Sequence, residues 1–206
     1  MLDPVLSPAL AAAFPSEATE GPQWRFAAGV LRPPNPYAKG QPEACETDWR
    51  GSTAAVLALD LGTRLGWALA DADGAIRAGS RRLDARAGEP VGQRYVRLGR
   101  FLTVLAEEAQ GLAAVYYEAV CAHKGTLAAH RYGAFEGTLQ AWCALADLSP
   151  TPVPVGTIKR SATGSGRASK EAVLAAMRAR GFAPADDNEA DALALLLWAL
   201  GRGDAR

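Results

Sequence analysis

The chain has 206 residues, a length that suits one domain with or without a tail. Its 22 Lys and Arg balance 22 Asp and Glu, which excludes a histone-like polycation and an acidic disordered chain. At 49% hydrophobic residues it can form a core, and no apolar run of membrane-spanning length is present. We expect a cytoplasmic protein, because the start lacks the basic region of a secretory signal and the three cysteines are irregularly spaced.

Residues 1–50 differ in composition from the rest of the chain. They are rich in Pro and Ala, and the prolines of Leu31–Tyr37 exclude a helix or a central strand there. We interpret residues 1–50 as a partly ordered extension, and a strand docked on the domain is the alternative. The domain itself is predicted to cover residues 51–206.

The first part of this domain has the pattern of three strands. Ala54–Asp60 is an apolar run long enough for a buried strand, and Arg64–Ala70 follows it after a turn. The hairpin signal at Asp71–Gly74 predicts that Ala75–Arg81 returns as a third, antiparallel strand. These segments therefore predict an antiparallel meander.

Helices and strands alternate after the meander, which indicates an α/β fold. The predicted elements are a helix within Pro90–Gln110, a strand at Leu112–Glu118, a helix at Leu127–Leu145, a strand at Thr151–Val155, and helices at Ser169–Arg180 and Asp187–Leu200. Ser169 is the expected N-cap of its helix, and Gly181 the expected stop. The segment between Val155 and Ser169 is interpreted as a basic loop.

Three carboxylates interrupt otherwise apolar elements: Asp60, Glu118 and Asp191. A buried, ionised carboxylate without a partner costs several kcal/mol, so each needs a hydrogen-bond partner or a cation. Mg²⁺ prefers oxygen ligands, and two such ions about 4 Å apart stabilise the attacking and leaving oxygens in phosphodiester cleavage. The alternative is that each acid is simply exposed at the end of its element.

Four blocks of sequence carry a resemblance to a known family. They are Leu57–Ala68, Val115–Val120, Val155–Lys170 and Asp186–Ala194. In this order they resemble the RuvC-like Holliday junction resolvases of the RNase H-like superfamily, including phage-type members. The resemblance covers about residues 54–200. It implies a mixed five-stranded sheet, an antiparallel meander followed by parallel strands, with helices on both faces. It also implies metal-dependent cleavage of branched DNA, such as Holliday junctions, by a homodimer.

The resemblance also implies a set of catalytic metal ligands. Asp60, Glu118 and Asp191 match the family's ligands for Mg²⁺, with Mn²⁺ as a substitute. The family's fourth ligand stands three residues before the last Asp, where this chain has Asn188. Asp187, one helical turn before Asp191, can take that role instead, and the choice between the two stays open.

Basic residues give the DNA-binding side of the prediction. Between Val155 and Phe182, six basic residues stand against Glu171 alone: Lys159, Arg160, Arg167, Lys170, Arg178 and Arg180. By the resemblance, Lys159 and Lys170 contact phosphate, and Lys124 is retained as a further contact. Arg160 and Arg167 are the other predicted DNA contacts, and the alternative is a solvated loop. The position of the family's aromatic wedge is Cys121 here, which makes a broader branched-DNA specificity plausible.

Two other functions compete with a nuclease. A DNA-binding or assembly module with a degraded site is favoured by the uncharged Asn188. An actin-like ATPase is suggested by Asp60–Thr63, but it needs a second similar domain for which the chain has no room. A zinc site built from cysteine and histidine fits no standard ligand spacing.

Overall fold

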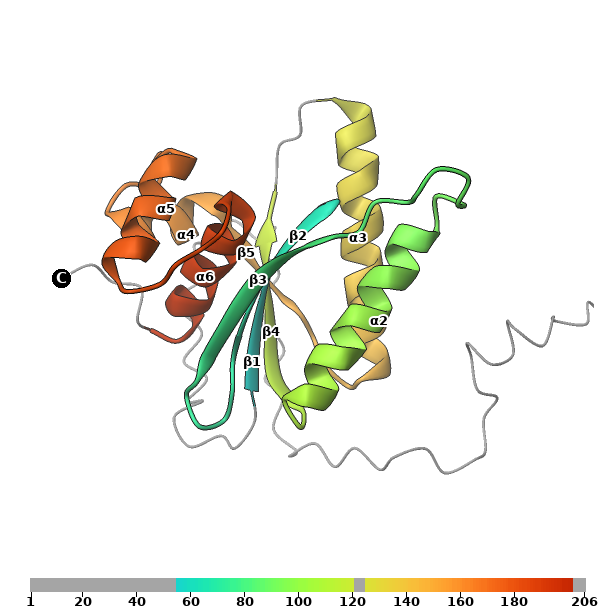
Figure 1. The fold of residues 1–206 in the computed structure, drawn as a ribbon, viewed down its shortest axis with the longest axis horizontal. Coiled ribbons are helices and arrows are strands. Elements are labelled where there is room, and N and C mark those ends of the chain that lie inside the picture. The colour runs from blue at the N-terminus through green and yellow to red at the C-terminus, as the bar shows by residue number, and fades with distance from the viewer. Residues whose placement is uncertain (1–54, 121–124, 202–206) are drawn as a thin grey trace, which may run out of the picture. The chain divides into compact units, whose positions relative to one another are not determined.

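The structure, a computed structural model, describes residues 55–120 and 125–201. The predicted extension, Cys121 and Lys124 lie outside the described residues. The strands are β1 (Ala55–Asp60), β2 (Arg64–Ala70), β3 (Ile76–Arg82), β4 (Leu112–Ala119) and β5 (Thr151–Pro154). The helices, labelled as in Figure 1, are α2 (Gln93–Glu108), α3 (Thr126–Leu145), α4 (Val155–Thr163), α5 (Lys170–Ala179) and α6 (Asp187–Ala199).

The five strands form one mixed sheet in the order β3-β2-β1-β4-β5. β1, β2 and β3 pair antiparallel, whereas β4 is parallel to β1 and β5 is parallel to β4. The α/β fold with an antiparallel meander followed by parallel strands is therefore confirmed. Apolar β1 has neighbours on both sides, as expected of a strand buried on both faces.

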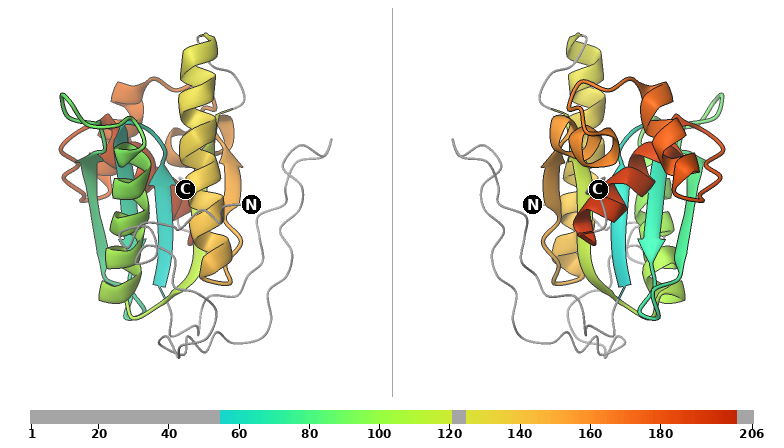
Figure 2. Two further views of the ribbon diagram at one scale, coloured as in Figure 1. Left: turned by 90° about the vertical axis from the view of Figure 1, so that its right-hand side faces the viewer. Right: turned by 90° about the vertical axis from the view of Figure 1, so that its left-hand side faces the viewer.

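Helices cover both faces of the sheet (Figure 2). α2 and α3 pack on one face, where Leu57 and Tyr117 contribute to the core. α4, α5 and α6 pack on the other, where Ala58 and Tyr116 contribute. Adjacent residues of β1 and of β4 thus serve opposite cores, because successive side chains of a strand point to opposite faces.

The segment Val155–Thr163 is helix α4, so the prediction of a loop there was wrong. The helix begins directly after β5, and Ile158 and Ala162 pack into the core one turn apart. No side chain caps its N-terminus, so the usual start signal was missing from the sequence. It ends at Gly164, whose φ of 83° suits a residue without a Cβ.

The predicted N-cap and the predicted stop of helix α5 are confirmed. Ser169 accepts a hydrogen bond from the backbone N–H of Ala172 at the start of α5, and Gly181 has a positive φ just after it ends. Within the described residues, none of the helices is both long and apolar enough to cross a membrane.

Candidate metal centre

Two acidic residues lie side by side at the end of the two central parallel strands. β1 and β4 pair Leu59 with Tyr117, and the next residues along each strand are Asp60 and Glu118. By strand alternation Asp60 lies on the same face as Ala58, and Glu118 on the same face as Tyr116. Both acids therefore emerge on the face that α6 covers.

Helix α6 brings the third acid to the same face. Asp191 lies in its second turn, and only 9% of its surface is exposed. The helix approaches the sheet closely at Gly66 of β2, where an added Cβ would stand 2.0 Å from the carbonyl oxygen of Asn188. Gly66 pairs with Asp60 across the β1–β2 ladder. The absence of a side chain at Gly66 thus lets the first turn of α6 lie beside the acids.

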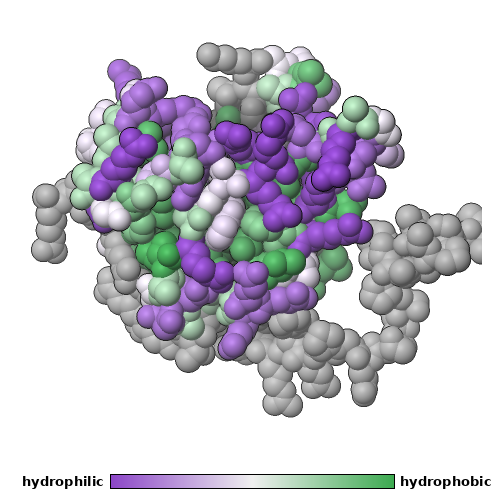
Figure 3. Space-filling view, viewed as in Figure 1, coloured by the Kyte–Doolittle hydropathy of each residue, from purple (hydrophilic) through white to green (hydrophobic). Residues whose placement is uncertain are grey.

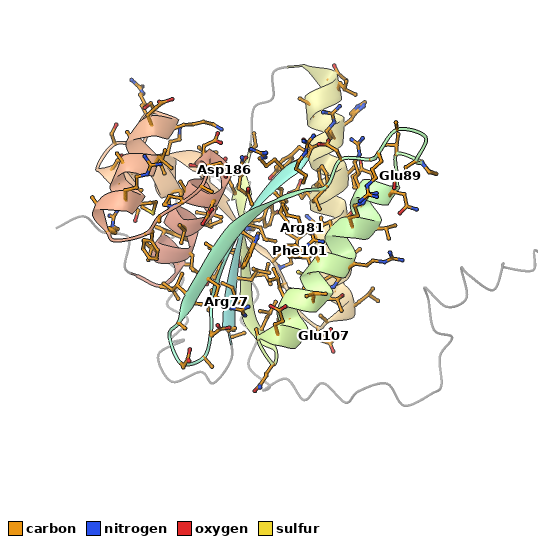
Figure 4. All side chains as sticks on the ribbon, in the orientation of Figure 1. Arg77, Arg81, Glu89, Phe101, Glu107 and Asp186 are labelled. Carbon is orange, nitrogen blue, oxygen red and sulfur yellow. The ribbon has the colours of Figure 1, made fainter. Side chains whose placement is uncertain are left out.

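The N-terminus of α6 is also held by hydrogen bonds. Asp186 is its N-cap and accepts a bond of 3.0 Å from the backbone N–H of Glu189. The other oxygen of Asp186 accepts a 2.6 Å bond from the Ser80 hydroxyl and a 3.4 Å bond from Arg64. Figure 4 shows Asp186 beside the edge strand β3. Asp186 therefore joins helix α6 to strands β2 and β3.

The three acids repel one another electrostatically. Burial, then the negative charges of Glu118 and Asp191, raise the pKa of Asp60 well above its ordinary value. Burial and the charge of Asp191 raise the pKa of Glu118 to about 7. Burial also raises the pKa of Asp191. These effects show that the predicted ligands share one electrostatic environment that favours a nearby positive charge.

Both candidates for the fourth ligand lie at the start of α6. The Asp187 carboxylate forms an ion pair with Lys170, which holds the pKa of Asp187 below its ordinary value. The negative charge of Asp187 nevertheless helps to raise the pKa of Asp60 and that of Asp191. The Asn188 amide donates a hydrogen bond to Asp187. Electrostatics therefore favour Asp187, and the fourth ligand stays a prediction.

The donor set and charge of this cluster suit a hard divalent cation, which prefers several carboxylate oxygens. In the described residues, however, no three His, Cys, Asp or Glu side chains are arranged as a coordination shell. Lysines supply part of the compensating charge, because Lys170 lowers the pKa of both Asp60 and Glu118. The acids thus fit the charge and chemistry of a metal, while their side chains would have to adjust to bind it.

The basic residues predicted from the sequence divide into two groups. The Lys159 amine donates to the carbonyl of Ala168, and its charge lowers the pKa of Glu118 and of Asp191. Arg160 and Arg167 are exposed on α4 and the turn after it. Arg180 instead donates to the Ser161 and Ala162 carbonyls, linking α5 to α4. On α2, Arg97 forms an ion pair with Glu89.

Sequence reasoning missed residues that position the acids. The Tyr132 hydroxyl of α3 donates a 2.7 Å hydrogen bond to the Glu118 carbonyl and accepts one from the Val120 N–H. Ser80 holds Asp186 from the edge strand. Neither residue belongs to a recognisable motif, since each acts through a contact distant in sequence. Gly66 could have been noticed in the sequence, because a glycine within a strand often marks the close approach of another backbone segment.

No family model and no curated protein matches the sequence. Two solved structures of RuvC from Thermus thermophilus are similar to this chain. The structure in complex with a Holliday junction substrate is 23% identical, with a TM-score of 0.61, over 72% of this chain and 95% of that chain. The other is 27% identical, with a TM-score of 0.55, over 70% and 92% of the two chains.

These similarities agree with the strand order and with the helices found on both faces of the sheet. They cover most of both chains, so they concern the whole described domain rather than one motif. The chain has the RNase H-like fold of the RuvC Holliday junction resolvase structures, as the four sequence blocks predicted.

Proposed function

We propose that the chain is a metal-dependent endodeoxyribonuclease that cleaves branched DNA such as Holliday junctions. The single observation that carries the proposal is the convergence of Asp60, Glu118 and Asp191 on one face of a RuvC-like fold, where burial raises the pKa of each. Partly buried acids that oppose one another are unfavourable for folding, and a bound cation offsets that cost.

Asp60, Glu118 and Asp191, with Asp187 or Asn188, are the residues that would hold the metal. Two divalent ions there would stabilise the charge on the attacking and leaving oxygens of a phosphodiester. The protein's own contribution is to position the acids, through Gly66 and the Asp186 cap.

Lys159, Arg160, Arg167 and Lys170 would bind the DNA backbone beside these acids. The charges of Lys159 and Lys170 lower the pKa of Glu118. The same charges would therefore attract a scissile phosphate bound beside that carboxylate. Arg160 and Arg167 are exposed on α4 and on the turn that follows it. Phosphate binding by such residues weakens steeply as the salt concentration rises. Lys124 is a further proposed contact.

A homodimer would let two such sites cut two strands of one junction. The exposed face of α3 supports this arrangement, because Gly133 and Gly137 have open space around them, and Leu127 and Leu145 are exposed on the same helix. Small residues allow another helix to approach closely, and the exposed leucines would lose contact with water. The partner we propose for this face is a second copy of the chain.

The direct test is to incubate the protein with labelled four-way junction, Y-fork and linear duplex in Mg²⁺. We expect nicks near the branch point in the first two substrates and none by the Glu118→Gln variant. Cleavage of linear duplex at the same rate as the branched forms would contradict the substrate assignment. Equal cleavage by Glu118→Gln would contradict the site assignment.

A non-catalytic DNA-binding module is the second candidate. It is favoured by the neutral Asn188 and by the lack, among the described side chains, of a finished coordination shell. Titration calorimetry with Mg²⁺ or Mn²⁺ separates the two. The nuclease predicts heat of binding for the wild type that Asp60→Asn abolishes, whereas the module predicts no binding to either protein.

A further inference from the structure

We propose that Arg64 and Arg82 form a second phosphate-binding surface, on the opposite side of the carboxylates from Lys159. This surface would hold the backbone of a DNA arm that continues past the site. The inference rests on the proposed function in its choice of DNA as the partner. It assigns DNA binding to two residues that are not among the DNA contacts predicted from the sequence.

The sheet places these arginines beside the acids. Asp60 pairs with Gly66 on β2, and Gly66 pairs with Ser80 on β3, so the three positions form a row across the sheet. Arg64 and Arg82 form the next pair on the same face, two residues before Gly66 on β2 and two residues after Ser80 on β3. β2 and β3 lie on one side of β1 in the sheet, whereas β5 lies on the other side. Helix α4, which carries Lys159, begins directly after β5.

Both guanidinium groups are accessible to a ligand. The Arg64 side chain is 53% exposed and that of Arg82 is 74% exposed. Arg64 forms an ion pair with Asp186 at an N···O distance of 3.4 Å, and Arg82 forms one with Asp84 at 3.3 Å. The Arg82–Asp84 pair is exposed and contributes little to stability, so a phosphate can replace Asp84 at small cost. Asp186 is only 18% exposed, and Arg64 can bind a phosphate with the other N–H groups of its guanidinium while it keeps Asp186. Figure 3 shows hydrophilic residues gathered over this end of β3.

The pairing of Arg64 with Arg82 is itself unfavourable. Like charges directly opposite one another in an antiparallel ladder destabilise the sheet. Charged side chains do protect an edge strand from pairing with other chains, but one arginine on β3 would serve that purpose. Two facing guanidinium groups instead match the charge and the bidentate geometry of phosphate oxygens.

Arg81 provides a matched control on the same strand. It points to the other face, where its guanidinium lies 4.5 Å from the centre of the Phe101 ring, toward α2 (Figure 4). An Arg81→Gln variant therefore removes one positive charge from β3, as Arg82→Gln does, without touching the proposed surface.

The test is binding of a labelled four-way junction in EDTA over a series of KCl concentrations, followed by fluorescence anisotropy. We expect the double variant Arg64→Gln/Arg82→Gln to bind at least about tenfold more weakly at low salt. The slope of log affinity against log salt should fall by about 2, one for each lost phosphate contact. Arg81→Gln should keep the wild-type slope, and Arg64→Lys/Arg82→Lys should recover most of it.

The outcomes separate the two proposals. A double variant that keeps the wild-type slope, while the wild type binds and cleaves the junction, overturns this inference and leaves the proposed function standing. A loss of about 1 in the slope for Arg81→Gln, the loss expected for one phosphate contact, also overturns it, because the effect would then follow total charge alone. A wild type that binds no DNA overturns both proposals. Thermal unfolding of each variant confirms that it is folded.

Discussion

Glu118 shows how a single side chain of the candidate site works against the stability of the fold. Its carboxylate shares a partly buried environment with Asp191, and the pKa rises from 4.5 to about 7. A carboxyl group whose pKa is higher in the folded than in the unfolded protein favours folding only while it is protonated. Its stabilising contribution is thus complete below pH 4.5 and is lost as the pH rises through about 7.

Replacing Glu118 by Gln should therefore stabilise the protein in EDTA. At pH 8 we expect Glu118→Gln to raise the free energy of unfolding by about 1–3 kcal/mol, because the neutral amide avoids the repulsion. At pH 4 the two proteins should be nearly equally stable. Urea unfolding at both pH values measures this difference. A variant less stable than the wild type at pH 8 would show that the carboxylates do not repel each other as described.

The contact between α6 and β2 decides the geometry of the site at the level of whole elements. α6 carries Asp187 and Asp191, and its first turn lies against the backbone of Gly66. A methyl group at Gly66 would overlap backbone atoms of Asn188, which cannot turn away as a flexible side chain can. The helix would have to move, and its acids would move with it.

We therefore expect Gly66→Ala to lower the free energy of unfolding by about 1–3 kcal/mol and to reduce junction cleavage by tenfold or more. Gly99→Ala in α2 is the control, since nothing lies within 4 Å of its added Cβ. This control should be neutral or stabilise the protein by roughly 0.5–1 kcal/mol, because alanine is the better helix former. Equal stability and activity of the two variants would contradict the close packing at Gly66.

The sequence predicts the elements better than the contacts between them. The predicted strand at Leu112–Glu118 puts Tyr116 and Tyr117 on opposite faces by alternation, and the two tyrosines do pack into opposite cores. Helix α4 was missed because it lacks a capping side chain and follows β5 without a loop. The convergence of the acids was expected from the family resemblance. The bond from Ser80 to Asp186, across 106 positions, follows from tertiary packing and has no local signal.

For the whole molecule, zero net charge conceals a separated charge distribution. Acids gather at the ends of β1 and β4 and at the start of α6, while basic residues occupy α4, α5 and the β2–β3 edge. A neutral total therefore does not exclude a nucleic-acid partner, since local potential rather than net charge guides such binding.

We also predict that the whole molecule forms a dimer. If the exposed face of α3 meets a second copy, a bulky charge at Gly137 should separate the two chains. We expect Gly137→Glu to sediment as a monomer where the wild type sediments as a dimer, with Arg178→Glu on α5 as the control that remains dimeric. Analytical ultracentrifugation measures both. A wild type that is monomeric at all concentrations, or a dimeric Gly137→Glu, would contradict this use of α3.

The most direct test of the central claim is single-turnover cleavage of a four-way junction in Mg²⁺ by the wild type and by Asp60→Asn, with junction affinity measured in parallel. Asp60 is the central acid, since three other carboxylates raise its pKa. We expect Asp60→Asn to bind the junction at least as tightly as the wild type and to cleave it at least about a hundredfold more slowly. Cleavage by Asp60→Asn at the wild-type rate would contradict the assignment of Asp60 as a metal ligand.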